Sequence, residues 1–163
     1  MRIWTQDELD QLISCSKQVA QPMRKQWRAE RGNRKNEFIL KSDSYEGVFP
    51  VYLRINDKFN ENFSIGLDYQ SPTEPRIHLL RCNGMHEHIN KFPELVPHCT
   101  FHVHKVKADA LNEGNGELNF AEITKEYAAY AEALPHFLNI VNVMKSEISK
   151  YFSFQSQLDF ELN

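Results

Sequence analysis

The chain has 163 residues, of which 41% are hydrophobic and 25% are charged, and its formal net charge is −3. This length is typical of one domain, the composition argues against intrinsic disorder, and the negative charge argues against a protein that coats nucleic acid over its whole surface. No apolar run approaches the ~20 residues needed to span a bilayer, and residues 1–8 carry no signal-peptide core. We therefore expect a cytoplasmic protein that does not bind membranes.

Charge and cysteines add two further expectations. Residues 17–41 hold eight basic and two acidic side chains, whereas residues 105–163 hold five lysines and nine acids. A local anion-binding face is compatible with this asymmetry, although a solvated basic surface is the commoner explanation. The cysteines Cys15, Cys82 and Cys99 are odd in number and far apart, so we expect reduced thiols rather than a disulfide framework or a zinc module.

The first predicted element is a helix over residues 5–20. Thr5 with Glu8 three residues later forms a capping-box pattern, which satisfies two otherwise free amide donors at a helix N-terminus. Apolar residues at helical spacing extend the pattern toward Trp27, and Pro22 should break or kink it.

The middle of the chain predicts one antiparallel meander. Short turn sequences separate five strand-like runs, namely 37–42, 48–56, 61–69, 75–82 and 98–107. Short connections favour hairpins, because parallel strands need a long crossover. The adjacent Leu79 and Leu80 leave open which face Arg81 takes, and they indicate either a sheet covered on both faces or a bulge.

The last third of the chain predicts a helix pair and a strand. Asn119 with Glu122 predicts a helix start, and Pro135 should end or bend that helix before a further helix reaches residue 150. Within residues 151–163 the apolar side chains follow a strand-like period of two, at Phe152, Phe154, Leu158, Phe160 and Leu162.

The predicted fold class is therefore α+β. We expect an antiparallel β-meander of about five strands flanked by an N-terminal helix and a C-terminal helix pair. The elements should form a single domain over 1–163, with 151–163 as a strand-like C-terminal extension that pairs with its own sheet or with another chain.

Six of the seven histidines lie between residues 78 and 104. Side chains alternate along a strand, so the polar residues of the run 98–107 should share one face and its apolar residues the other. The polar set is His98, Thr100, His102 and His104, and the apolar set is Cys99, Phe101 and Val103. The intervening loop could bring His86 and His88 over the polar set, with Arg76 or Arg81 within reach.

Three interpretations of this cluster remain open. In the first, the histidines are surface groups on the solvated side of a sheet, and burial of His102 or His104 with a bond to backbone would indicate a structural role. In the second, His102 and His104 bind a metal ion with His88, His98 or Glu87. In the third, which we favour, histidines act as general acid and base on a phosphate bound by arginine, without a metal.

The hairpin also resembles a family of small bacterial domains without an assigned function. The family pattern is a strand Leu-Leu-Arg-x-Asp, a loop with His-x-Asn, and a strand with His-x-His. The matching residues here are Leu79, Leu80, Arg81, Asn83, His88, Asn90, His102 and His104. Asn83 stands where an acid is usual. The arrangement is similar to small toxin proteins of toxin–antitoxin pairs, and the resemblance covers most of residues 5–145.

This resemblance implies a bacterial toxin-like protein that acts on RNA and is held by a cognate antitoxin protein. We expect a metal-independent nuclease or phosphotransfer domain that needs no cofactor, and the catalytic candidates are His88, His102, His104 and Arg81. The binding candidates are Arg76, Asn83, Asn90 and His98. The alternative is a non-catalytic binding module that captures a metal ion, an anion or a protein partner, and a homodimer is compatible with both.

Overall fold

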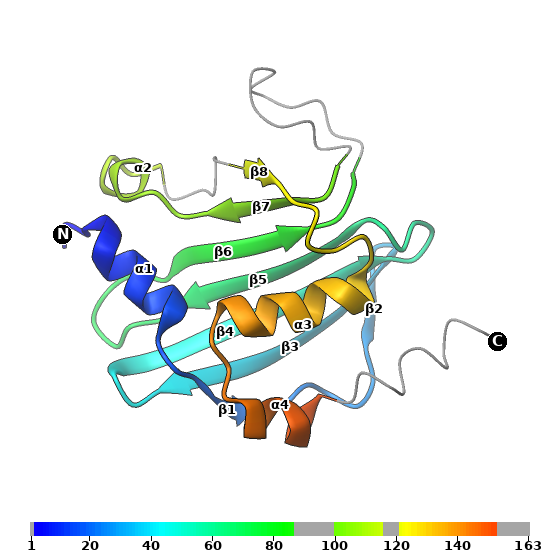
Figure 1. The fold of residues 1–163 in the computed structure, drawn as a ribbon, viewed down its shortest axis with the longest axis horizontal. Helices are drawn as coiled ribbons and strands as arrows, with labels where there is room; N and C mark the ends of the chain where they lie inside the picture. Colours follow the sequence, from blue (N-terminus) through cyan, green and yellow to red (C-terminus); the bar gives the residue numbers. More distant parts are fainter. Residues whose placement is uncertain (1, 87–99, 116–120, 153–163) are drawn as a thin grey trace.

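The computed structural model describes residues 2–86, 100–115 and 121–152 of the chain, which form a sheet with helices on one of its faces (Figure 1). The strands are β1 (Gln18–Gln21), β2 (Arg28–Glu30), β3 (Asn33–Ser42), β4 (Tyr45–Asn56), β5 (Phe63–Tyr69), β6 (Ile77–Asn83), β7 (His102–Lys105) and β8 (Ala121–Ile123). The helices are α1 (Gln6–Ser14), α2 (Ala108–Asn112), α3 (Tyr130–Ile140) and α4 (Lys145–Tyr151). The predicted α+β class is confirmed.

The sheet has the strand order β1-β3-β4-β5-β6-β7-β8, and β2 pairs with the other end of β3. Every pairing between these strands is antiparallel. Strands β3 to β7 follow one another in the sequence and pair in the same order, so the predicted five-strand meander is confirmed. The short strands β1, β2 and β8, which the sequence pattern did not indicate, extend the sheet at its edges.

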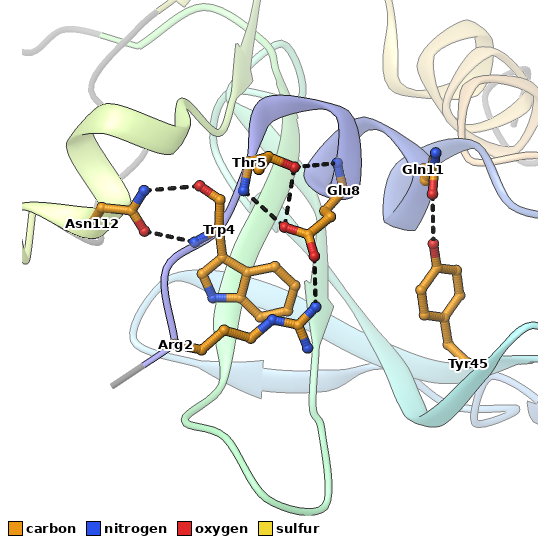
Figure 2. A network of polar contacts seen from close by, with 7 residues as sticks. All are labelled: Arg2, Trp4, Thr5, Glu8, Gln11, Tyr45 and Asn112. Carbon is orange, nitrogen blue, oxygen red and sulfur yellow. Dashed lines mark hydrogen bonds and ion pairs between the residues drawn. The ribbon is translucent and has the colours of Figure 1, made fainter.

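Helix α1 begins where the capping box predicts (Figure 2). The backbone N–H of Glu8 donates to Thr5 Oγ1 at 3.2 Å, and the backbone N–H of Thr5 donates to Glu8 Oε2 at 2.8 Å. The helix ends at Ser14, however, so the prediction of a helix to residue 20 was wrong. The chain turns at Lys17, whose Nζ donates back to the carbonyl of Ile13 at 2.7 Å, and then pairs with β3 as β1.

The C-terminal helices also begin later than predicted. The segment expected to open a helix forms β8 instead, and α3 begins at Tyr130. Pro135 lies inside α3 and does not end it, so the prediction that it would end or bend the helix is not borne out as a helix end. The buried side chains of α3 are Ala133, Leu134, Phe137 and Leu138.

The hydrophobic core lies between the helices and the face of the sheet that they cover (Figure 1). Alternate residues of β3 and β4 are buried there, among them Phe38 and Leu40 on β3 and Val51 and Leu53 on β4. Phe152 is 7% exposed and packs edge-on against Phe38, with ring centroids 5.1 Å apart. The predicted strand beyond it falls on residues 153–163, outside the described part of the chain.

None of the helices in the described part of the chain is long and apolar enough to cross a membrane.

Candidate functional site

The second face of the sheet carries a polar cluster at its centre. Directly paired residues of antiparallel strands project to the same face, so the strand register places the side chains in two neighbouring rows. The first row is Arg54, Ser64, Asn83 and His102, and the second is Tyr52, Gly66, Arg81 and His104. We call these eight residues the polar face.

A β-bulge in β6 decides which way Arg81 points. Leu67 pairs with Leu80 whereas Asp68 pairs with His78, so Leu79 is an extra residue on β6. The bulge lets Leu79 and Leu80 both be buried, while His78 and Arg81 project to the second face. Of the two alternatives left open by the sequence, the bulge is therefore the one that the structure contains.

His102 is completely buried and both of its ring nitrogens are engaged. Nδ1 lies 2.7 Å from the carbonyl oxygen of Thr100, and Nε2 lies 3.1 Å from Nδ2 of Asn83. A carbonyl can only accept, so Nδ1 carries the proton and Nε2 of the neutral ring accepts from Asn83. This is the arrangement expected of a structural histidine. His102 thus fixes Asn83 on the neighbouring strand.

The rings of His104 and His86 both pack against the ring of His102. The ring centroid of His102 is 5.0 Å from that of His104 and 5.2 Å from that of His86, in both cases edge to face. His104 is 3% exposed and His86 is partly exposed. Arg81 is the register partner of His104, so these two residues lie beside His102. The predicted cluster also included His88, which lies outside the described part of the chain, so the cluster as a whole stays a prediction.

Arg54 and Arg81 are two partly buried cations that have no acidic partner in the part of the chain that the structure describes. Arg54 donates to three neutral oxygens, Asn33 Oδ1 at 2.9 Å, Asn62 Oδ1 at 2.8 Å and Ser64 Oγ at 3.2 Å. Neither arginine forms an ion pair with a described residue. Burial lowers the pKa of Arg54, and the charge of Arg81 lowers it further. The two guanidinium groups therefore repel each other.

Nε of Arg81, a donor, and Oδ1 of Asn83, an acceptor, are buried polar atoms that have no hydrogen-bond partner among the described residues. Asn83 itself is only 2% exposed. A buried polar atom without a partner is costly, and such atoms in a native protein call for an explanation such as a bound ligand or water.

Tyr52 lies flat across Gly66, between Arg54 and Arg81 in the register. A Cβ placed on Gly66 would lie 2.1 Å from atoms of the Tyr52 ring, so only glycine leaves room for it. Burial raises the pKa of the Tyr52 hydroxyl, and the positive charge of Arg81 opposes this rise. Tyr52 therefore remains a neutral hydroxyl beside a guanidinium group at neutral pH.

The next row along the second face contains an acid and a histidine. The carboxylate of Asp68 is 2% exposed; it accepts from Nε of Arg76 at 2.7 Å and lies 2.7 Å from Nδ1 of His78. The hydrogen bond with Asp68 is the main cause that raises the pKa of His78, against burial and the charges of Arg76 and Arg81. Arg76, which the sequence predicted to bind a ligand, forms an ion pair with Asp68.

Beneath the polar face, Tyr127 fixes the strands that carry Asn83 and His102. Its buried hydroxyl lies 3.0 Å from the carbonyl oxygen of Asn83 and 2.9 Å from that of His102. Burial raises the pKa of the neighbouring Cys82 thiol to about 12, so this cysteine is the inert reduced thiol that the sequence led us to expect.

Sequence reasoning missed Arg54, Tyr52, Asp68 and His78. For Asp68 there was a signal, because it is the only charged residue in the otherwise uncharged strand Phe63–Tyr69. Arg54 and Tyr52 alternate with the buried residues of β4, which is the pattern of any solvated strand face.

Three predicted site residues, His88, Asn90 and His98, lie outside the described part of the chain. Over the described ranges, no group of three His, Cys, Asp or Glu side chains is placed to hold a metal ion. The metal site that we considered requires His88, His98 or Glu87, so it stays a prediction.

Comparisons of the chain with protein-family models, with curated proteins and with solved structures gave no match.

Proposed function

We propose that this protein binds a phosphate group on the polar face, between Arg54 and Arg81, and acts there on RNA as a metal-independent nuclease or phosphotransfer domain. The observation that carries the proposal is the pair of partly buried guanidinium groups with no acidic partner among the described residues.

Like charges held close together at a partly desolvated position are unfavourable, and a bound anion relieves the repulsion. Other arginines on or beside the sheet form ion pairs: Arg24 with Glu37, Arg34 with Asp57 and Arg76 with Asp68. Arg54 and Arg81 differ, since their neighbours are amides, hydroxyls and imidazoles. Such surroundings supply donors to an anion, and the Asp68 carboxylate in the next row is already bound to Arg76 and His78.

Phosphate fits this site better than a carboxylate does. Arginine can bind either anion through two parallel hydrogen bonds, but a phosphate has more acceptor oxygens and can therefore also accept from donors on other strands. The unpartnered Nε of Arg81 would donate to it, and Oδ1 of Asn83 can accept from a hydroxyl of the same ligand. In a phosphoryl reaction the two guanidinium groups would also stabilise the charge that develops on the phosphate oxygens.

The RNA substrate and the toxin role are more specific than phosphate binding and have support of their own. They are supported by the sequence resemblance to toxin proteins of toxin–antitoxin pairs, and by histidines beside the proposed phosphate site. A toxin of this kind would need a cognate antitoxin protein to hold it. In the alternative, a non-catalytic module binds an anion with the same arginine pair but does not cleave RNA.

Calorimetric titration with inorganic phosphate tests the core of the proposal. Replacing Arg81→Gln or Arg54→Gln should weaken binding about 10- to 100-fold, the loss expected for a charge-assisted hydrogen bond of about 1.5–3 kcal/mol. The matched control is Arg24→Gln, which removes an arginine whose side chain is 50% exposed and paired with Glu37. It should bind phosphate as the wild type does.

Equal phosphate binding by the wild type, R54Q and R81Q would reject the site. With an RNA oligonucleotide in chelator, cleavage by the wild type that R81Q loses would support a nuclease. Binding without cleavage would favour the non-catalytic module. Growth arrest of bacteria that express the wild type but not R81Q is the result expected of a toxin.

A further inference from the structure

The Asp68–His78 pair presents a histidine that is held at one nitrogen and open at the other. The carboxylate of Asp68 is 2% exposed, whereas 52% of the His78 side chain is exposed. A carboxylate accepts and does not donate at neutral pH, so Nδ1 of His78 carries the proton. Nε2 of the neutral ring then has a lone pair, and it makes no hydrogen bond to a described residue.

His78 differs in this respect from the histidines that the sequence singled out. Both nitrogens of His102 are engaged within the protein, and its ring is fully buried. His78 combines a buried carboxylate that fixes the ring with an accessible second nitrogen. This combination is the one that general-base catalysis requires, because the base must be oriented and must reach the substrate.

The strand register places His78 beside the proposed phosphate site. Asp68, the partner of His78, lies two residues along β5 from Gly66, the partner of Arg81. Two residues of a strand span about 7 Å, and both positions project to the same face. The charge of Arg81 acts on His78 and that of Asp68 acts on Tyr52, in agreement with this proximity.

We propose that His78 is the catalytic base of this protein, with Asp68 as its positioning residue, and that it accepts the proton of a ribose 2′-hydroxyl next to the phosphate held by Arg54 and Arg81. This inference rests on the proposed function, and it names the group that performs the proton transfer.

In the proposed step, Nε2 of His78 takes the proton of the 2′-hydroxyl and the 2′-oxygen forms a bond to phosphorus. The bond from phosphorus to the 5′-oxygen breaks, and that oxygen takes a proton from water. The products are a 2′,3′-cyclic phosphate and a free 5′-hydroxyl, and the imidazolium of His78 returns its proton to the solvent. DNA lacks the 2′-hydroxyl and is therefore not cleaved.

The pH dependence of cleavage follows from the charged groups that act on His78. They are Asp68 on β5, Arg76 just before β6 and Arg81 on β6. The hydrogen bond with Asp68 raises the pKa of His78, and the two arginines and partial burial oppose it. Only the neutral ring accepts a proton, so the cleavage rate should rise with pH through that pKa. Removing the carboxylate should shift this rise to lower pH.

The test uses the full chain, an RNA oligonucleotide and its DNA counterpart, all in chelator. His78→Gln should lower kcat for RNA by at least about 100-fold, the usual contribution of a positioned base, while the dissociation constant for inorganic phosphate stays that of the wild type. The exposed position of His78 makes a folding defect unexpected. His136→Gln is the control, since His136 belongs to α3 on the other face and should leave cleavage unchanged.

A second variant examines the positioning role. In Asp68→Asn, NMR titration should give His78 a lower pKa than in the wild type, and the rise of the cleavage rate should move to lower pH by the same amount. A cyclic phosphate product and no cleavage of DNA are expected. If His78 were not the base, its pKa would still fall in D68N, but the pH profile of cleavage would not move with it.

Three results would overturn the assignment of His78. They are an H78Q variant that cleaves RNA at the wild-type rate, equal cleavage of DNA and RNA, and a wild type that binds phosphate but cleaves no RNA. All three leave the arginine site intact. Failure of that site would be seen separately, as phosphate binding that does not depend on Arg54 or Arg81.

Discussion

Gly66 shows how a single residue keeps the polar face in shape. Its position on β5 is paired with Tyr52 on one side and Arg81 on the other, and the Tyr52 ring occupies the space that a side chain would fill. The backbone at this position needs no unusual dihedral angles, so the requirement for glycine comes from the neighbour alone.

Gly66→Ala should therefore displace the Tyr52 ring. A methyl group in contact with the ring should lower the free energy of unfolding by about 1–3 kcal/mol and weaken phosphate binding by changing the position of Arg81. Chemical denaturation and calorimetry measure the two effects.

The double variant Gly66→Ala with Tyr52→Ala serves as the control, because it removes the ring that the methyl group meets. The two changes should then be strongly non-additive in stability. Additive effects would mean that the ring and the glycine do not constrain each other.

The contrast between His78 and His102 also belongs at the scale of residues. Both are fixed at Nδ1, His78 by a carboxylate and His102 by a backbone carbonyl. The hydrogen bond with the Asp68 carboxylate raises the pKa of His78, and of the two histidines His78 is the one that keeps its ring at the surface. Position in the strand register, and not the residue type, separates a candidate base from a structural histidine.

At the scale of elements, the hairpin of β6 and β7 carries most of the site and depends on a residue from outside it. Tyr127 lies just before α3 and directs its hydroxyl to the carbonyls of Asn83 and His102, one on each strand. These are the residues whose side chains meet on the other face. The Tyr127 hydroxyl therefore contacts the backbone of Asn83 and His102, the two residues whose side chains meet on the polar face.

Tyr127→Phe should lower the free energy of unfolding by about 1 kcal/mol, since it removes a buried hydrogen bond and keeps the ring. The backbone amides of β6 and β7 should also exchange hydrogen faster than in the wild type. Hydrogen-exchange mass spectrometry resolves this effect by segment.

Tyr45→Phe is the matched comparison, because the Tyr45 hydroxyl makes only an exposed bond of 3.3 Å to Gln11. Its stability should stay within about 0.5 kcal/mol of the wild type. Equal effects of the two substitutions would contradict a special role for Tyr127.

At the scale of the whole molecule, Lys17 joins elements that are far apart in the sequence. Its side chain is completely buried, and Nζ donates to the carbonyls of Ile13 at 2.7 Å, Cys15 at 2.9 Å and Val141 at 3.0 Å. Ile13 is near the end of α1 and Val141 caps α3, so one ammonium group satisfies free carbonyls at two helix C-termini. Burial lowers the pKa of Lys17.

Lys17→Met should lower the free energy of unfolding by about 2–4 kcal/mol, because three buried carbonyls lose their donor while the aliphatic part of the side chain is kept. Denaturation with urea measures the loss. Lys41→Met is the control: Lys41 is exposed on β3, and its replacement should leave stability nearly unchanged. A Lys17→Met variant as stable as the wild type would mean that packing of the aliphatic part of the side chain, and not the hydrogen bonds of Nζ, stabilises the contact between α1 and α3.

Much of this fold follows from local sequence patterns. The capping box of Thr5 and Glu8 starts α1, and strand-like runs with short turns dictate the meander, because hydrogen bonding between consecutive strands needs only a tight reversal of the chain. The sequence also placed His102 and His104 on one face opposite Val103, since side chains of a strand alternate. None of these inferences required knowledge of a contact distant in the sequence.

The tertiary structure decided the remainder. The strands β1, β2 and β8 are only three or four residues long, and they exist because a neighbouring strand offers its hydrogen-bonding edge. The bulge at Leu79 turned Arg81 to the polar face, and the register brought Asp68 to His78. The same register gave Arg54 and Arg81 no acid as a partner within residues 2–86, 100–115 and 121–152. Partners and burial are properties of residues far apart in the chain. They arise only once the strands are aligned, so the sequence determined which residues could do chemistry and the fold decided which of them meet.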